Sequence, residues 1–416
     1  MIQVLQFCVR RAANCAATLL LLVAFGSAAA GETTLHEFMA GSDGAFPGGG
    51  VIGDRAGYLY GTTISGGNGG CGFGCGVVFK LGPDGTETIL HDFEGTDGWG
   101  PGGSLLADSR GDLYGTTYVG GGQGDGGVLY ELAPDGSYTV LYRFCSRTGC
   151  RDGADPLGAL IADNSGNLYG TTSYGGADGS GTVFKLTKKG RETVLYSFCS
   201  QGCADGYSPS AGLVADASGN LYGTTETGGA NGYGVAFKVA PDGTETVLHS
   251  FCNSNDSCSD GSLPDSALII DGNGNLYGST LFGGGGDPGC GVVYKIAPDG
   301  TESIVHDFQG GADGCQPAGL ILDGQGNILG VSASGGNGPK CSSFGPTGCG
   351  TVFKITPDGT ETVLFAFPSP RRGYQPMASL FEDRKGTLYG TTSFGGERPP
   401  CRKFGYGCGV VFKLRQ

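Results

Sequence analysis

The sequence has 416 residues, of which 86 are glycine, and its formal net charge is −14. This length fits one large domain or two ordinary ones. The excess of acidic residues argues against nucleic acid and anionic membranes as partners, and the glycines lack the three-residue period of collagen.

Residues 1–30 have the features of an export signal. Arg10 and Arg11 precede the apolar run AATLLLLVAFG, and an Ala-x-Ala cleavage site ends at Ala30. A retained anchor is the alternative, but the apolar run is shorter than the about 20 residues that span a bilayer. We therefore expect export by the general secretory route and no membrane insertion after the signal is removed.

The cysteines predict a disulfide-bonded protein. Of the 16, Cys8 and Cys15 lie in the signal, which leaves 14, an even number, as a disulfide framework requires. Zinc would need clusters of three or four ligands with histidine nearby, and the sequence contains none. The spacing predicts these pairs: Cys71–Cys75, Cys145–Cys150, Cys199–Cys203, Cys252–Cys258, Cys341–Cys349 and Cys401–Cys408, with Cys290 and Cys315 left over.

A repeat of 52 to 60 residues fills the rest of the chain. Its clearest mark is the motif LYGTT, which occurs seven times with small changes, starting at Leu59, Leu113, Leu168, Leu221, Leu276, Ile328 and Leu388. In residues 209–251, AGLVAD, LYGTTET, VAFKVA and TETVLHSF read as four short strands, which we name A to D. The turns ASGN and PDG and the loop GGANGYG separate them.

Seven repeats of four antiparallel strands predict an all-β, seven-bladed β-propeller. The rival is a β-solenoid, but its coils are shorter, roughly 20 to 30 residues. The seventh repeat has only strands A to C, while GETTLHEF (31–38) matches strand D, so we expect the N-terminal strand to complete the last blade. The expected blades span about 47–93, 101–144, 156–198, 209–251, 264–308, 317–367, and 376–414 with 31–38.

The repeat unit DGxxP…GLxxDxxGNLYGTTxxGGxxGxGxVFKLxPDGTETVLHxF resembles the GloVer (Gloeo/Verruco) tandem repeat of exported bacterial proteins. The resemblance covers nearly the whole mature chain. It implies a propeller-like repeat domain and an envelope or extracellular location, but no activity. Members of this family carry varied C-terminal anchors, whereas this sequence ends in a predicted blade strand.

Antiparallel order places the A–B and C–D turns on one face of the disc and the long B–C and D–A loops on the other. The long loops contain every mature cysteine, so Cys290 and Cys315, in neighbouring loops, can bond to each other. A rigid scaffold can present variable loops for binding, so this face is the expected functional face. Stiffening of glycine-rich loops is the plainer explanation of the disulfides.

The D–A loops repeat one acidic residue in the motif DGxxP. Because strand A lines the channel, we expect these carboxylates to form a ring near its mouth, where they could bind Ca²⁺. Ordinary turn chemistry is the alternative explanation, and the sequence requires no cofactor. Arg372 takes this position in the seventh repeat; the acids in the others are Asp43, Asp97, Asp152, Asp205, Asp260 and Asp313.

Positions where the repeats differ are the candidates for a specific function. The four histidines share one outer-strand position, which argues against histidine-based hydrolysis. Glu226 with Asp155 or Asp205 could perform acid–base glycoside chemistry. Aromatic and basic exceptions suited to ligand binding, unless they serve loop packing, are Trp99, Tyr207, Tyr374, Tyr118 and Arg372.

We therefore expect a monomeric secreted or periplasmic protein that acts as a non-catalytic binding scaffold. Its ligand would be a glycan or a protein bound on the disulfide-bearing face. The first alternative is a carbohydrate-active enzyme, either a glycoside hydrolase or a polysaccharide lyase, with acids or tyrosine at the channel mouth. The second alternative is a structural envelope protein.

Overall fold

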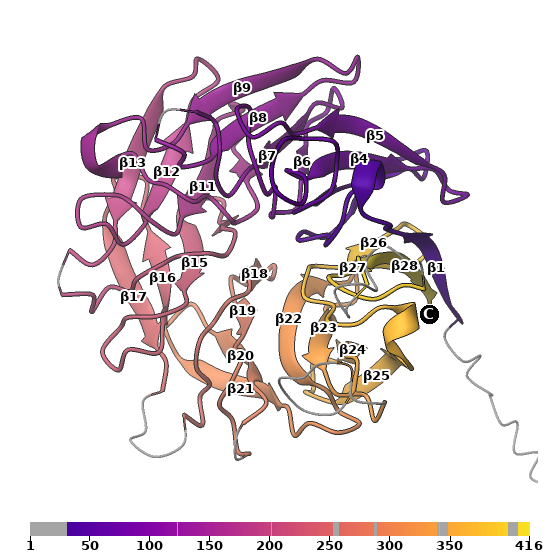
Figure 1. Cartoon of the computed structure of the whole chain (residues 1–416). Helices are drawn as coiled ribbons and strands as arrows, with labels where there is room; N and C mark the ends of the chain where they lie inside the picture. The colour runs from indigo at the N-terminus through magenta and orange to yellow at the C-terminus, as the bar shows by residue number, and fades with distance from the viewer. Residues whose placement is uncertain are drawn as a thin grey trace, which may run out of the picture.

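The computed structural model describes residues 31–416 except 123, 201, 253–257, 287–288, 339–340, 342–347 and 398–406. These residues form seven four-stranded antiparallel sheets arranged in a ring, with strand A at the centre and strand D outside (Figure 1). The predicted seven-bladed β-propeller is confirmed. The predicted export signal lies outside the described residues. In the described part of the chain, no helix has the length and apolarity needed to cross a membrane.

The blades follow one another around the ring. Blades one to three contain, in order, β2 (Ile52–Gly53), β3 (Leu59–Thr63), β4 (Val77–Leu81) and β5 (Glu87–Asp92); β6 (Leu106–Ala107), β7 (Leu113–Thr116), β8 (Val128–Leu132) and β9 (Tyr138–Arg143); and β10 (Ile161–Ala162), β11 (Leu168–Thr172), β12 (Thr182–Leu186) and β13 (Glu192–Ser197). Blades four to six contain β14 (Val214–Ala215), β15 (Leu221–Thr225), β16 (Val235–Val239) and β17 (Glu245–Ser250); β18 (Ile269–Ile270), β19 (Leu276–Ser279), β20 (Val292–Ile296) and β21 (Glu302–Asp307); and β22 (Cys315–Leu322), β23 (Ile328–Ser334), β24 (Thr351–Ile355) and β25 (Glu361–Ala366). Blade seven contains β26 (Phe381–Glu382), β27 (Thr387–Thr392), β28 (Val410–Arg415) and β1 (Gly31–Glu37), and three short 3-10 turns lie in D–A loops: η1 (Gly41–Asp43), η2 (Thr148–Cys150) and η3 (Pro370–Arg372).

The N-terminal strand closes the ring as the split repeat predicts. β1 pairs antiparallel with β28 from Gly31 opposite Arg415 to Glu37 opposite Val410. Its register shifts between Thr34 and His36, and the D strand of blade one shifts at the equivalent place, opposite Val78 and Phe79. The closing strand therefore reproduces the repeat, including its bulge.

Strand A is shorter than its apolar run predicts. It has two residues in every blade except blade six, where β22 has eight. The residues before strand A instead approach the neighbouring blade closely. A Cβ added to Gly49 would lie 2.6 Å from the carbonyl carbon of Gly103, and one added to Gly158 would lie 2.5 Å from the carbonyl oxygen of Ala211. These inner segments therefore pack backbone against backbone around the axis, which glycine permits.

The core lies at the seams between blades. At each seam the phenylalanine that follows strand D meets the aromatic residue of strand C in the next blade, edge to face, as aromatic pairs prefer. The seven pairs, with ring centroids 4.8 to 5.4 Å apart, are Phe38–Phe79, Phe93–Tyr130, Phe144–Phe184, Phe198–Phe237, Phe251–Tyr294, Phe308–Phe353 and Phe367–Phe412. All these rings are buried, so the recurring aromatic residues of strands C and D pack the blades together.

The glycine of LYGTT makes room for this aromatic residue. Gly170 lies opposite Phe184 in the sheet, and a Cβ added there would lie 2.8 Å from the Phe184 ring. We expect Gly170→Ala to lower the free energy of unfolding by about 1–3 kcal/mol, the usual cost of overpacking a core. Urea unfolding measures this. Gly272→Ala, in an open turn with nothing within 4 Å, is the control, and equal losses in both variants would contradict the packing argument.

Candidate functional site

The long loops lie together on one face of the disc, which we call the long-loop face. In six blades an isolated antiparallel bridge joins the incoming D–A loop to the B–C loop of the same blade. The bridges are Ala45–Ser65, Trp99–Val119, Ala154–Tyr174, Tyr207–Thr227, Ser262–Phe282 and Tyr374–Phe394. In blade six, Cys315 opposite Ser334 extends the ladder of β22 and β23. Two loops thus support each other at every blade.

Disulfides add to this support. Cys290–Cys315 joins the B–C loop of blade five to the first residue of β22 in blade six. The other bonds lie within single loops: Cys71–Cys75, Cys145–Cys150, Cys199–Cys203, Cys252–Cys258 and Cys341–Cys349. The predicted pair Cys401–Cys408 falls partly outside the described residues, because Cys401 is not among them. Several disulfides are typical of a protein that folds in an oxidising compartment outside the cytoplasm.

A cavity of about 300 Å³ opens where the innermost segments converge on the long-loop face. Its lining comes from blades one, five, six and seven, which lie around the axis (Figure 1). The lining residues are Gly48, Ile64, Asp265, Ser266, Leu281, Pro317, Ala318, Met377 and Ser393. Most of these side chains are apolar or small, and Asp265 is the charged residue among them. We call this cavity the central cavity.

Asp265 is the chemically distinctive group of the central cavity. Burial is the main cause that raises its pKa to about 6, and the negative charge of Glu226 adds to the rise. A hydrogen bond from the hydroxyl of Ser210, with 2.9 Å between the two oxygens, acts in the opposite direction. A carboxyl group with such a pKa is partly protonated near neutral pH. It can therefore donate as well as accept a hydrogen bond to a polar ligand.

The predicted ligand-binding residues differ in accessibility. Trp99 and Tyr118 are each 43 % exposed on the long-loop face, and Tyr207 is half-buried. Tyr374 is only 3 % exposed and stacks on Phe394 with ring centroids 5.3 Å apart, so it supports the loops instead of offering a ring to a ligand. Arg372 forms an ion pair with Glu32 of the closing strand.

The acids predicted for glycoside chemistry have different surroundings. Asp205 lies at the seam between blades three and four, where its carboxylate accepts a hydrogen bond from Tyr196 at 2.6 Å. Asp155, in the D–A loop before blade three, is half-buried, and burial raises its pKa. The carboxyl group on which Glu226 acts is Asp265. Asp265 could have been found in the sequence, because it is the one acid among the residues that follow the proline of the D–A loop.

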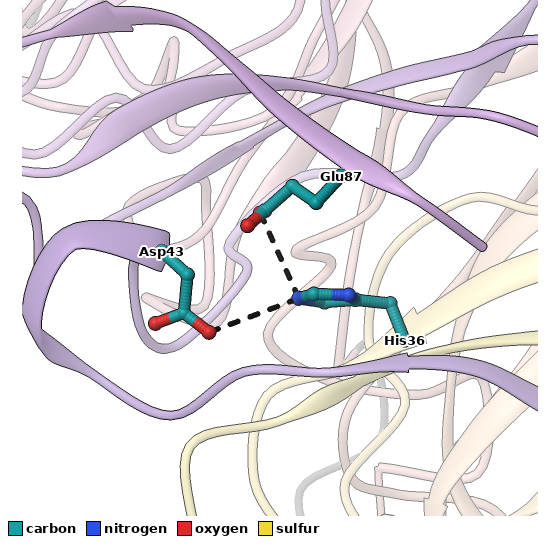
Figure 2. Close-up of side chains that lie close together, drawn as sticks. All are labelled: His36, Asp43 and Glu87. Atoms are coloured by element: carbon teal, nitrogen blue, oxygen red, sulfur yellow. Dashed lines mark ion pairs between the residues drawn. The ribbon is translucent and has the colours of Figure 1, made fainter.

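The aspartates of DGxxP do not surround the channel, so that expectation is corrected. Each lies against strand D at the outside of the disc, because its side chain turns back toward the preceding blade; His36 and Asp43 show this arrangement (Figure 2). The partners in the other five blades, at 2.6 to 3.0 Å, are His91 for Asp97, Tyr142 for Asp152, Tyr196 for Asp205, His249 for Asp260 and His306 for Asp313.

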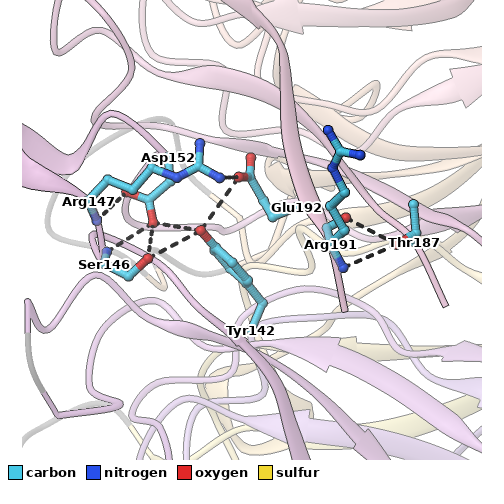
Figure 3. A network of polar contacts seen from close by, with 7 residues as sticks. All are labelled: Tyr142, Ser146, Arg147, Asp152, Thr187, Arg191 and Glu192. Carbon is cyan, nitrogen blue, oxygen red and sulfur yellow. Dashed lines mark hydrogen bonds and ion pairs between the residues drawn. The ribbon is translucent and has the colours of Figure 1, made fainter. Parts of the chain in front are cut away.

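The seam between blades two and three shows how the polar residues around one of these aspartates connect neighbouring blades (Figure 3). Asp152 is fully buried and accepts hydrogen bonds from Tyr142 and from the backbone amide and hydroxyl of Ser146. Arg147 pairs with Glu192 of the next blade at 2.7 Å. Burial acts to raise the pKa of Asp152, but the hydrogen bonds from Ser146 and Tyr142 outweigh it and lower the pKa. This group joins two blades.

Five of the seams also contain a glutamate that was not among the predicted site residues. It is the first residue of strand D, and it faces the aspartate of the preceding loop. Burial and this neighbouring charge raise the pKa of Glu87 to about 8 and that of Glu245 to about 7. The signal in the sequence was the glutamate that begins strand D in five blades, within TET at residues 86–88, 244–246 and 360–362.

Comparisons with known proteins agree with this architecture. The model of the Gloeobacter/Verrucomicrobia repeat matches residues 22–217, 68–289 and 212–416. A solved structure of streptogramin B lyase is similar, with 14 % identity, a TM-score of 0.60, and coverage of 92 % of this chain and 97 % of that one. The extracellular domain of a hybrid two-component system from B. thetaiotaomicron is similar at 11 % identity and a TM-score of 0.54, covering 89 % of this chain and 39 % of that one.

Both structural likenesses are too distant in sequence to show more than the fold. A search among curated proteins found no match. The three overlapping repeat matches together span the chain from residue 22 to its end, and the protein therefore belongs to the Gloeobacter/Verrucomicrobia repeat family.

Proposed function

We propose that this exported propeller is a non-catalytic binding protein whose long-loop face, centred on the central cavity, engages a glycan or a protein ligand. The observation that carries the proposal is the distribution of exposed apolar side chains. Of the eleven large hydrophobic residues exposed in the described structure, eight lie in the long loops: Ile64, Phe73, Trp99, Tyr118, Tyr174, Tyr233, Phe282 and Met377.

A glycan is the better match of the two ligand classes. Six of those eight side chains are aromatic rings and can stack on the apolar faces of sugars, and Asp265 with Ser210 offers polar groups at the centre. Ile64 and Tyr118 both lie within 4 Å of a Cβ added to Gly100, so neighbouring blades present their side chains together. The cavity volume is at the lower end of the range for small-ligand sites.

Binding should depend on this face alone. In a glycan-array screen of residues 31–416, with and without calcium, we expect Trp99→Ala and Tyr118→Ala to weaken the best hit about tenfold or more, which corresponds to about 1.4 kcal/mol. Tyr58→Ala is the matched control, because Tyr58 is also exposed but lies in an A–B turn on the opposite face. A loss in Tyr58→Ala as large as in the other two would contradict the proposal. Binding only to a protein would select the other ligand class.

A second candidate function is a carbohydrate-active enzyme, either a glycoside hydrolase or a polysaccharide lyase. The observation that favours it is the pKa of Asp265, about 6, which suits a general acid near neutral pH. Mass spectrometry of array hits after incubation tests this. Product release that disappears in Asp265→Asn, while binding remains, would replace the non-catalytic function with an enzymatic one.

A further inference from the structure

Three potential metal ligands meet where the ring is closed. His36 belongs to the closing strand β1, Asp43 to η1 in the loop that follows it, and Glu87 to β5 of blade one (Figure 2). One ligand atom from each lies within 4.8 Å of the other two. An ion bound there would connect the N-terminal strand to the blade on the other side of the seam.

The His36 nitrogen lies farther from the two carboxylates than a direct hydrogen bond allows, and Oδ2 of Asp43 accepts a hydrogen bond from the backbone amide of Met39 at 3.0 Å. The Nε2 atom of His36 lies 3.9 Å from Oδ2 of Asp43 and 3.7 Å from Oε1 of Glu87. Hydrogen bonds of this kind measure 2.7 to 3.2 Å. Two ligands of a tetrahedral ion with bonds of 2.0–2.1 Å lie roughly 3.3 Å apart. The group is therefore slightly wider than a metal shell, and a small inward movement of each side chain would complete it.

Burial and charge also favour a cation at this seam. The side chains of His36, Asp43 and Glu87 are 15 %, 13 % and 11 % exposed, so the group is shielded but can be reached from solvent. Oε1 of Glu87 is buried and accepts no hydrogen bond within the described structure. The carboxylates of Asp43 and Glu87 share this seam with the imidazole of His36. A bound divalent ion would compensate both charges.

The other seams provide an internal comparison. His91 is hydrogen-bonded to Asp97 at 2.9 Å and stacks on Tyr138, the residue that starts strand D of blade two, where blade one has Glu87. His306, Asp313 and Glu361 form a second group within 4.8 Å. There, however, His306 and Asp313 are already joined by a hydrogen bond of 3.0 Å. An ion at that second group would have to displace the His306–Asp313 hydrogen bond, whereas at the closing seam His36 and Asp43 lie 3.9 Å apart.

We propose that His36, Asp43 and Glu87 bind one Zn²⁺ ion, with water as the fourth ligand, and that this ion fastens the closing strand to blade one. An imidazole nitrogen with two carboxylates suits zinc, whereas Ca²⁺ takes six to eight oxygen ligands. The proposal is independent of the ligand bound on the long-loop face. It also differs from calcium binding by a ring of aspartates, because it uses one seam and a nitrogen ligand.

Titration calorimetry of EDTA-treated protein (residues 31–416) with ZnCl₂, together with thermal unfolding, tests the proposal. We expect one equivalent of zinc to bind and to raise the melting temperature, as a ligand specific for the folded state does, and CaCl₂ to have no such effect. Glu87→Gln and His36→Tyr should each weaken zinc binding at least tenfold. The tyrosine variant copies Tyr196, the residue at the same position in blade three.

Two control variants separate this seam from the others. Glu245→Gln removes the equivalent glutamate at the seam where Tyr196 replaces histidine, and His306→Tyr alters the second group; both should leave zinc binding unchanged. Unchanged binding in Glu87→Gln and His36→Tyr, or loss of binding in His306→Tyr alone, would overturn the proposal. If His36→Tyr does not fold, the isosteric Glu87→Gln variant decides.

Discussion

Removal of residues 31–38 is expected to abolish the cooperative unfolding of this protein, and the free peptide GETTLHEF is expected to restore it. β1 supplies the outer strand of blade seven and pairs along the whole of β28. Phe38 is 2 % exposed and packs against Phe79 of blade one. Loss of a buried phenylalanine side chain alone costs about 3–5 kcal/mol, a large part of a typical domain stability of about 5–15 kcal/mol.

The truncated protein would also expose an edge. β28 would present unpaired backbone groups, a known cause of aggregation, and a peptide of matching sequence can pair with such an edge. Differential scanning calorimetry with and without peptide measures the effect. A peptide carrying Phe38→Ala and a scrambled peptide are the controls. If the truncated protein unfolds cooperatively at the midpoint of the intact chain, the closure has no energetic role.

Stability is expected to fall as the pH rises from about 5 to 9. Burial, with the charge of Asp205, raises the pKa of Glu245 from 4.5 to about 7. Burial also raises that of Glu361 to about 7; Asp313 adds to the rise and His306 opposes it. Between the unfolded and folded pKa the folded state binds more protons than the unfolded state, so stability is full below about 4.5 and is lost as the pH rises through about 7.

Glu245→Gln provides the specific test of this pH dependence. Glutamine resembles the protonated glutamate, so at pH 9 the variant should be more stable than the wild type by on the order of 1–2 kcal/mol, after allowance for solvent screening. Near pH 5 the two should be equal. Urea unfolding in EDTA at both pH values measures the difference, and Glu94→Gln, at an exposed position, is the control. Equal differences at both pH values would show that Glu245 does not titrate as described.

At low pH, the stability of the folded state should depend on a different repeated residue, the aspartate of the A–B turns. Asp163, in the A–B turn of blade three, accepts hydrogen bonds from the amides of Ser165 and Asn167 and from the side chain of Asn167. Burial alone would raise its pKa, but these bonds lower it below 3.8. Its contribution is present above that value and is lost as the pH falls through the lower folded pKa. Maximum stability is therefore expected between about pH 4.5 and 6.

The fold was predictable because the same pattern of strands and turns recurs in all seven repeats. Seven copies of LYGTT and the strand pattern around them fix the number of blades, and the split between GETTLHEF and the last three strands predicts the closure. The strand and turn patterns within each repeat predict the same four-stranded blade that the number of repeats requires for a propeller. The two-residue length of most A strands was not predictable, because it depends on contacts between blades such as Gly49 against Gly103.

The site was less predictable, because side-chain direction is not contained in a repeat period. DGxxP correctly places its aspartates in the D–A loops, but they could have turned toward the channel or toward strand D, and hydrogen bonds to residues such as His91 select strand D. Tyr374 likewise differs from its repeat neighbours, yet it is buried against Phe394. Asp265 acquires its properties from burial in the central cavity, which no sequence pattern reports.

Hydrogen exchange of residues 31–416, with and without the best array ligand, tests most directly whether the long-loop face binds. We predict slower exchange in segments that contain Trp99, Tyr118 and Asp265, and no change in the PDG and DxxGN turns of the opposite face. Protection confined to those turns, at a ligand concentration where binding is saturated, would contradict the proposed binding face.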